Sequence, residues 1–225
     1  MKRVALLAVG SFNPPTIAHL RMLEVARCHL ESKDTQVVEG IISPVADSYN
    51  NKSTLIKASH RLEMVRAATK SSEWIRADGW ECTRATWTRT LDVLAHHREQ
   101  VQAKFGSDVG LMLVVGGDVV DSFTRILPDG SNLWKSADII KIITEFGLLV
   151  LSRDQSHPMD TIEKMSEIPK NLAEKIEMIV DDVCPVSAVS STRLRAAISA
   201  KKSIKYATPD EVIDYIRIND LYRSS

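Results

Sequence analysis

Short, uninterrupted apolar runs alternate with amphipathic segments along the chain, and this pattern narrows the choice of fold most. Residues 4–9 and 146–151 show no polar alternation, which predicts strands that are buried on both faces. Between them lie segments such as residues 17–30, whose apolar side chains recur every three or four positions, as in a helix packed on one side. Alternating strands and helices favour right-handed crossovers, so we predict an α/β, doubly wound domain with a mostly parallel sheet.

The other elements are predicted from the same two periodicities. Further strands are expected at 37–43, 74–77 and 110–115, and helices at 60–69, 83–104, from 119 onward, 136–143, 191–199 and 209–218, the last with Pro209 in its first turn. Residues 174–180 fit either a helix end or a strand. Because no repeat or long linker interrupts the pattern, residues 1–225 are expected to form a single domain.

Composition limits the partners and the compartment. The 29 basic and 29 acidic side chains give a formal net charge of zero, so no basic field is available to attract nucleic acid or an acidic membrane. The three cysteines form no paired motif, and no apolar run is long enough for a signal peptide or a membrane span. We therefore expect a soluble intracellular protein, with the cytoplasm favoured and the nucleus and mitochondrion left open. Homo-oligomer formation is also left open.

The turn after the first predicted strand is a candidate phosphate site, and we call residues 10–19 the N-terminal anion segment. In open α/β sheets, ligands bind outside the carboxyl ends of the strands. Gly10 permits close approach of the backbone, and Ser11 and Phe12 offer N–H groups. Thr16 is expected to cap the following helix, which places His19 one turn in and on the side of the threonine hydroxyl. The alternative is an ordinary capped helix whose histidine packs against the sheet.

A second candidate lies near the other end of the sequence, and we call residues 189–195 the C-terminal anion segment. Small hydroxyl residues precede a predicted helix whose first turns carry Arg193 and Arg195. A helix start favours negative charge, so two cations there are better explained if phosphates bind beside them. The alternative is an exposed basic turn.

The two segments together resemble the signatures of the nucleotidyltransferase superfamily. The N-terminal one matches G-x-F-[DN]-P-x-[TH]-x-x-H and the C-terminal one is similar to I-S-S-T-x-x-R. Further matches at residues 40–49, Gly116-x-Asp118, residues 132–135 and residues 209–222 resemble the eukaryotic nicotinamide mononucleotide adenylyltransferases. The resemblance covers nearly the whole chain and implies a single nucleotidyltransferase domain with a Rossmann-like fold.

The resemblance implies an activity and a set of site residues. The reaction would transfer AMP from ATP to nicotinamide mononucleotide, and also to nicotinic acid mononucleotide, by direct in-line attack without a covalent intermediate, forming NAD and releasing pyrophosphate. Mg²⁺ would enter with ATP, whose phosphates supply most of its ligands, so no protein metal site is expected. The residues implied at ATP are Gly10, Ser11, Phe12, His19, Gly116, Asp118, Thr192, Arg193, Leu194 and Arg195; those at the mononucleotide are Ser11, Phe12, Trp87, Thr90, Leu133, Trp134 and Arg153. The implied catalytic donors are His19, Lys52 and Arg195.

Two departures from the family pattern affect this assignment. The loop after Tyr49 carries only Lys52 where the family has consecutive lysines, and Ser187 stands near a position where the family has asparagine.

The tryptophans favour a flat, positively charged acceptor ring. Trp87 and Trp134 would stack on it and add a cation–π contribution, and Trp87 would share one helix face with Thr90. The alternative is that both tryptophans belong to the core. Two other functions stay open: adenylyl or cytidylyl transfer to a different phosphorylated acceptor, and a nucleotide-binding, chaperone-like protein on the same fold.

Overall fold

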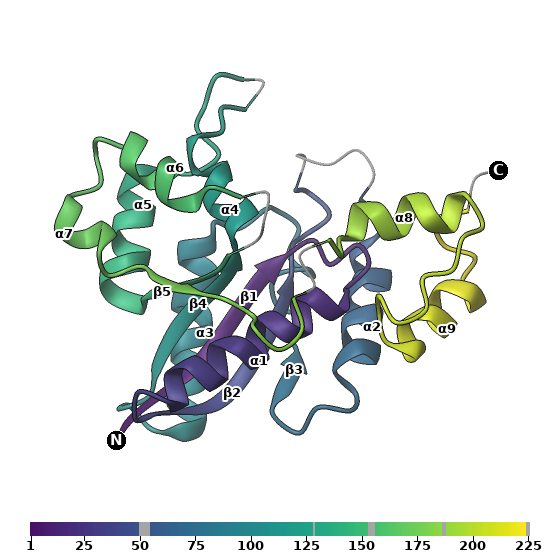
Figure 1. Ribbon diagram of the computed structural model, residues 1–225, viewed down its shortest axis with the longest axis horizontal. Coiled ribbons are helices and arrows are strands. Elements are labelled where there is room, and N and C mark those ends of the chain that lie inside the picture. Colours follow the sequence, from purple (N-terminus) through teal and green to yellow (C-terminus); the bar gives the residue numbers. More distant parts are fainter. Residues whose placement is uncertain (50–54, 128, 153–155, 186–187, 224–225) are drawn as a thin grey trace. The chain divides into compact units, whose positions relative to one another are not determined.

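The computed structural model of the protein describes residues 1–49, 55–127, 129–152, 156–185 and 188–223 (Figure 1). Contacts divide the chain into two compact units, each assembled from separate stretches of sequence. The first unit comprises Met1–Leu7, Met22–Val38 and Arg89–Pro185, and the second comprises Ala8–Arg21, Glu39–Thr88 and Val186–Ser225. Lys52, Arg153 and Ser187 lie outside the described residues.

Six strands form one sheet in the order β3-β2-β1-β4-β5-β6. They are β1 (Lys2–Gly10), β2 (Thr35–Pro44), β3 (Ile75–Ala77), β4 (Gly110–Gly116), β5 (Leu148–Leu151) and β6 (Glu177–Ile179). The pairings of β1 with β4, β2 with β3, β4 with β5 and β5 with β6 are all parallel. This order is that of a doubly wound nucleotide-binding sheet, so the predicted fold class is confirmed. The ambiguous segment at 174–180 contains a strand, β6.

Helices alternate with strands along most of the chain, as the apolar periodicity predicted, and two helices follow the last strand. They are α1 (Ile17–Glu31), α2 (Ala58–Thr69), α3 (Thr90–Phe105), α4 (Gly117–Asp121), α5 (Ser136–Lys141), α6 (Pro158–Lys164), α7 (Lys170–Ala173), α8 (Ser191–Ser199) and α9 (Asp210–Ile218), with a 3₁₀ turn η1 (Ser122–Thr124) and a π-helical turn η2 (Ile142–Phe146). The short α6 and α7 were not predicted. Among the described residues, no helix combines the length and the apolar character that a bilayer crossing requires.

β4 and β5, which lie side by side in Figure 1, form the centre of the first unit. Residues 111–116 and 148–151 are all buried, as expected for parallel strands covered on both faces. Between α1 and β6, His29 Nε2 lies 2.9 Å from Glu177 Oε2, and Lys33 Nζ donates to the same oxygen at 2.8 Å.

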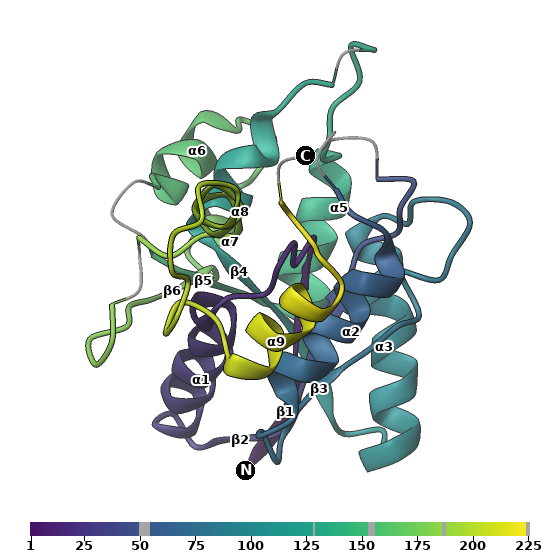
Figure 2. The same cartoon turned by 90° about the vertical axis from the view of Figure 1, so that its right-hand side faces the viewer.

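The second unit is held by an apolar cluster among its helices. α9 packs alongside α2, as Figure 2 shows. The buried members of the cluster are Met64, Ala68, Leu194, Ile204, Val212 and Ile216. Because Leu194 belongs to α8, the cluster fixes the helix that begins within the C-terminal anion segment.

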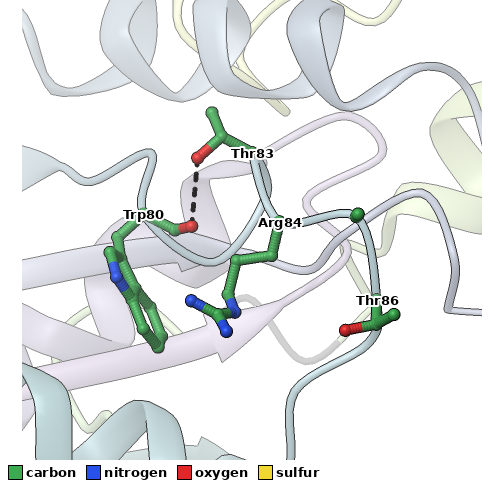
Figure 3. Close-up of a pocket in the computed structure, with 5 residues that line it drawn as sticks. Trp80, Thr83, Arg84 and Thr86 are labelled. Atoms are coloured by element: carbon green, nitrogen blue, oxygen red, sulfur yellow. Dashed lines mark hydrogen bonds between the residues drawn. The ribbon is translucent and has the colours of Figure 1, made fainter.

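The predicted helix at 83–104 begins seven residues later than expected, at Thr90. Residues 83–89 contain three threonines and a tryptophan, which are poor helix formers, and the Thr83 hydroxyl donates to the Trp80 carbonyl at 3.1 Å (Figure 3). The expectation that Trp87 and Thr90 share one helix face is therefore wrong, because Trp87 precedes the helix. Arg84 stacks over the Trp80 ring, 4.7 Å from its centroid, beside a hollow of about 400 Å³.

Two helix ends also differ from the prediction. Pro209 is the N-cap residue of α9 rather than a member of its first turn. The helix predicted at 136–143 continues through the π-helical turn η2 to Phe146, and the C-cap residue Gly147 has a φ of 94°, which glycine adopts without strain.

Candidate active site

The carbonyl groups of the turn after β1 are bound by donors from elsewhere in the second unit. Hydrogen bonds of 2.8–3.2 Å run from Val45 N–H to the carbonyl of Gly10, from Arg61 to Ser11, from Arg195 to Asn13, from Ser191 to Pro14 and from Thr208 to Pro15. In a trans peptide the N–H points away from the C=O. The contacts at Gly10 and Ser11 therefore direct the N–H groups of Ser11 and Phe12 to the opposite side of the turn, as an anion site requires.

His19 contacts the first residue of its own turn. Its Nδ1 accepts a hydrogen bond from the Thr16 backbone N–H at 2.9 Å and lies 2.8 Å from Thr16 Oγ1. The predicted proximity of His19 to the threonine hydroxyl is confirmed. However, the capping hydrogen bond runs from the Thr16 N–H to the histidine side chain, which is the reciprocal half of a capping box. Since Nδ1 acts as an acceptor, the proton of the neutral ring is on Nε2, which is then a hydrogen-bond donor.

Phe12 holds this turn in an unusual backbone conformation. Its φ of 44° lies in the left-handed region, which costs a non-glycine residue about 1–3 kcal/mol unless the surroundings impose it. The side chain is buried, and its ring meets the His19 ring edge-on at a centroid distance of 5.0 Å. Packing of the phenyl ring therefore fixes both the turn and one side of the histidine.

The C-terminal anion segment docks onto the N-terminal one. The Ser190 side chain accepts from the Arg193 N–H at 3.3 Å, which caps α8 as the hydroxyl-rich sequence predicted. Ser191 Oγ donates to the Pro14 carbonyl, and Arg195 Nη1 donates to that of Asn13, both at 2.8 Å. The structure thus brings together two segments that lie about 180 residues apart in sequence.

The remaining members of the C-terminal segment play different parts. Arg193 Nη1 donates to the Ala188 carbonyl at 2.9 Å, and Arg195 Nη2 donates to Thr192 Oγ1 at 3.3 Å. The side chains of Thr192 and Arg193 are exposed, whereas that of Leu194 is buried in the apolar cluster. Leu194 therefore anchors α8, and its predicted contact with ATP stays a prediction.

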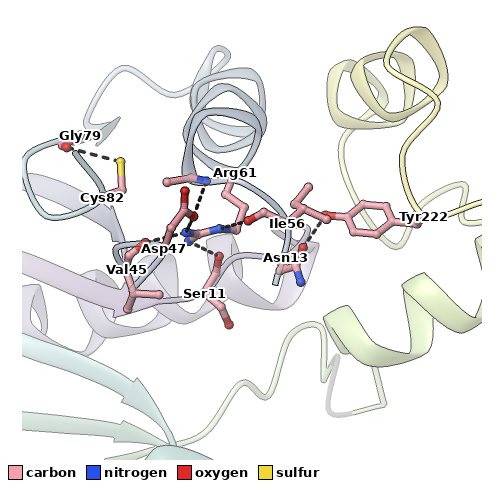
Figure 4. A network of polar contacts seen from close by, with 10 residues as sticks. Ser11, Asn13, Val45, Asp47, Ile56, Arg61, Gly79, Cys82 and Tyr222 are labelled. Carbon is pink, nitrogen blue, oxygen red and sulfur yellow. Dashed lines mark hydrogen bonds and ion pairs between the residues drawn. The ribbon is translucent and has the colours of Figure 1, made fainter. Parts of the chain in front are cut away.

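Three residues outside the predicted set support the same turn (Figure 4). Arg61 is fully buried and binds the Ser11 carbonyl, Asp47 accepts from Arg61 at 3.0 Å, and the Tyr222 hydroxyl donates to Asn13 Oδ1 at 2.7 Å. Burial raises the pKa of the Tyr222 hydroxyl, which therefore stays protonated as a donor. Sequence reasoning missed Arg61 because an arginine in an amphipathic helix is usually assigned to the solvent face.

Glu81 is a second buried polar residue that the sequence analysis did not identify. Its side chain is almost fully buried, and Ser43 Oγ donates to Glu81 Oε2 at 2.9 Å. Burial raises the pKa of the Glu81 carboxyl to about 8, although the serine hydrogen bond and the charge of Arg61 act in the opposite direction. The carboxyl is therefore mostly protonated near neutral pH.

Trp87 and Thr90 are both predicted to bind the mononucleotide, and they lie on either side of the point in the sequence where the chain passes from the second unit to the first. Trp87 is half-buried in the second unit, and its ring lies 6.0 Å from that of Tyr49. Thr90 begins α3 in the first unit. Neither is buried, so the core interpretation of Trp87 is not favoured.

The other predicted residues lie in the first unit. Trp134 Nε1 donates to Ser122 Oγ at 3.0 Å, and its half-buried ring lies 4.9 Å from the ring of Phe123. Leu133 beside it is buried. β4 ends at Gly116, and the exposed Asp118 follows in the first turn of α4, so its carboxylate is open to a polar ligand.

Among the described residues, no group of three or more histidine, cysteine, aspartate and glutamate side chains is arranged to hold a metal ion.

Comparison with known proteins identifies the family. The family model described as cytidylyltransferase-like matches residues 7–197. Over 223 residues the chain is 75% identical to nicotinamide/nicotinic acid mononucleotide adenylyltransferase 2 of Caenorhabditis elegans, with 99% of each chain covered. It is 37% identical to nicotinamide/nicotinic acid mononucleotide adenylyltransferase of Arabidopsis thaliana, covering 97% of this chain and 90% of that protein.

Solved structures agree on the fold. Nicotinic acid mononucleotide adenylyltransferase of Plasmodium falciparum, in complex with NaAD, superposes with a TM-score of 0.68 at 19% identity, covering 99% of this chain and 98% of that one. The family model and the two relatives confirm the resemblance inferred from the two anion segments. The chain belongs to the cytidylyltransferase-like family and, within it, to the nicotinamide/nicotinic acid mononucleotide adenylyltransferases.

Proposed function

We propose that this protein transfers AMP from ATP to nicotinamide mononucleotide or nicotinic acid mononucleotide, releasing pyrophosphate and forming the corresponding dinucleotide. The observation that carries the proposal is the docking of one anion segment on the other. Ser191 and Arg195 bind carbonyls of the turn whose Ser11 and Phe12 N–H groups are directed to the opposite side. Backbone donors, a helix start and arginines are combined there, as a polyphosphate requires. The relatives of this family carry the names of both mononucleotides.

The reaction needs no nucleophile from the protein. The phosphate of the mononucleotide attacks the α-phosphorus of ATP in line, a new P–O bond forms, and the bond to pyrophosphate breaks. The protein holds the two anionic substrates in the orientation that in-line attack requires, and it stabilises the negative charge that develops in the transition state. We assign this stabilisation to His19, through its Nε2–H, and to Arg193 and Arg195, with Lys52 as a further donor. Mg²⁺ enters with ATP as part of the substrate.

The remaining residues are assigned to the two nucleosides. Gly116 and Asp118 would bind the adenosine ribose, for which an exposed carboxylate at the end of β4 is a suitable acceptor. Trp87 and Trp134 would stack on the pyridine ring. The remaining contacts proposed for the mononucleotide are Thr90, Leu133 and Arg153, together with the backbone of Ser11 and Phe12.

One assay tests the function against its alternatives. The protein is incubated with Mg-ATP and, separately, with nicotinamide mononucleotide, nicotinic acid mononucleotide and phosphopantetheine, and pyrophosphate and dinucleotide are measured. We expect both products with the pyridine mononucleotides and neither with phosphopantetheine. The same reactions with CTP test the choice of nucleotide. Product formation with phosphopantetheine alone, or ATP binding without any pyrophosphate, would contradict the proposal.

Trp134 offers a test of acceptor recognition. Trp134→Ala removes the stacking surface and is expected to raise the KM for the mononucleotide about 10-fold while the KM for ATP changes much less, because ring stacking is worth roughly 1 kcal/mol beyond area burial. Trp134→Phe keeps an aromatic face and loses only the donor to Ser122, so its KM should stay near that of the unaltered protein. Trp87→Ala should behave as Trp134→Ala does. Equal changes in both KM values would indicate a packing role instead.

A further inference from the structure

Arg61 is a fully buried cation whose guanidinium binds the backbone at three places. Nε donates to the Ile56 carbonyl at 2.9 Å, Nη1 to the Ser11 carbonyl at 3.2 Å, and Nη2 to the Val45 carbonyl at 2.7 Å (Figure 4). Nη2 also lies 3.0 Å from Asp47 Oδ1. The guanidinium thus joins the residue after β1 to the residue after β2 and to the segment before α2.

The charge of Arg61 is only partly offset by its surroundings. Three of its four acceptors are neutral carbonyls, and the fourth belongs to Asp47, whose side chain is 57% exposed and whose Oδ1 also accepts from the Ala58 N–H. An exposed carboxylate is screened by water, whereas the buried guanidinium is not. A well-packed apolar side chain often stabilises a core at least as well as a buried ion. Packing alone therefore does not account for a cation at this position.

One peptide group transmits the effect of this cation to the turn. The Ser11 carbonyl that accepts from Arg61 belongs to the same peptide unit as the Phe12 N–H, which points the opposite way. A donor bound to the oxygen of an amide polarises it and makes its N–H a stronger donor. Arg195 binds the Asn13 carbonyl, but the next residue is proline and that peptide has no N–H.

We propose that Arg61 is a positioning residue for adenylyl transfer. It fixes the Ser11–Phe12 peptide and strengthens the Phe12 N–H as a donor to a phosphate of ATP, although its own side chain never touches the nucleotide. This inference rests on the proposed function, because it assigns the N-terminal anion segment to ATP. The left-handed backbone of Phe12, with its φ of 44°, is the conformation that the contact would hold in place.

Arg61→Lys tests the proposal, with Arg66→Lys as the matched control. A lysine keeps the charge but offers donors from one atom, so it cannot bridge acceptors in three segments. Arg66 lies on the same helix, and the contact that it makes there is a surface ion pair with Glu63. For Arg61→Lys we expect kcat to fall about 10–100-fold, less than for the outright loss of a preorganised donor because the Phe12 N–H is weakened and not removed, with the KM for the mononucleotide within about twofold. Arg66→Lys should match the unaltered protein.

Binding measurements separate positioning from general damage. The affinity for α,β-methylene-ATP should fall about 10-fold in Arg61→Lys, as for one charge-assisted contact, whereas that for adenosine should be unchanged. If the role of Arg61 is purely structural, Arg61→Lys should lower the affinities for α,β-methylene-ATP and adenosine equally. Alternatively, neither affinity should fall once the measurements are corrected for the fraction of protein that is folded. Either result overturns the proposal. Low millimolar guanidinium added to Arg61→Ala should restore part of the lost α,β-methylene-ATP affinity, and ammonium at the same concentration should not.

A spectroscopic measurement can begin with the unaltered protein. Addition of inorganic tripolyphosphate should move the amide proton resonance of Phe12 downfield, and the shift should be smaller in Arg61→Lys. If tripolyphosphate binds and the Phe12 resonance does not move, the proposal is wrong. The proposed function fails differently: the protein would then form no dinucleotide in the product assay, whatever the behaviour of the Phe12 amide.

Discussion

His19→Ala is expected to lower kcat about 10²–10³-fold, the usual scale for the loss of one preorganised donor at a developing charge. The physical reason is the orientation of the ring. Nδ1 is held as an acceptor by the Thr16 N–H at 2.9 Å, so the proton is on Nε2, which we assign to the α-phosphate of ATP. Steady-state kinetics with saturating ATP and mononucleotide measure the effect, and thermal unfolding checks that the fold is intact.

Two isosteric variants separate the two nitrogens of His19. The amide of His19→Gln can place a donor near the position of Nε2, whereas the amide oxygen of His19→Asn can accept from Thr16 in the place of Nδ1. We expect His19→Gln to keep more activity than His19→Asn. The reverse order would mean that the capping contact with Thr16 is what matters. Near-normal turnover in His19→Ala would remove this residue from the mechanism.

Glu81→Gln is expected to stabilise the protein at pH 8 by a few kcal/mol while leaving stability at pH 5 nearly unchanged. The pKa of the buried carboxyl is raised to about 8, so from about pH 4.5 to 8 the folded chain retains a proton that the unfolded chain has lost. Folding stability therefore falls as pH rises through this window, by roughly 1.4 kcal/mol per pH unit at most. Glutamine keeps an acceptor for Ser43 Oγ and has no proton to lose.

Denaturant unfolding at several pH values between 5 and 8 measures this effect. The control is Glu63→Gln, which alters an exposed glutamate that pairs with Arg66 on the surface of α2 and should leave the pH dependence unchanged. If Glu81→Gln shows the same decline between pH 5 and 8 as the unaltered protein, the carboxyl is ionised in the folded state and the expectation is wrong.

The fold could be predicted from sequence where a segment's periodicity and its burial coincide. Uninterrupted apolar runs predicted β1 and β5, and the regular apolar spacing predicted α1. The structure contains all three elements. The start of the helix predicted at 83–104 is wrong, because Trp87 fits the apolar spacing of the helix but lies among three threonines before its first residue, Thr90. Those residues favour local side-chain bonds over helix, as the Thr83 contact illustrates.

The candidate site was predicted in part for a similar reason. The two anion segments carry their residue types in the local sequence, so both could be predicted as candidates; Ser191 and Arg195 place them in contact, and their binding of ATP stays a prediction. Arg61 and Glu81 could not be found in that way, because what distinguishes them is burial, which depends on residues distant in sequence. Their environment, rather than their type or spacing, gives each its chemistry.

The donors that hold the carbonyls of the first turn have a consequence for the order in which this protein matures. The turn lies within the first 19 residues, but Ser191, Arg195 and Thr208 bind it, and the Tyr222 hydroxyl binds Asn13. During synthesis, which proceeds from the N-terminus at about 5–20 residues per second, the turn leaves the ribosome well before these partners exist. These contacts of the turn therefore form only after the later residues have been made, and a nascent chain lacking residues 191–222 cannot form them.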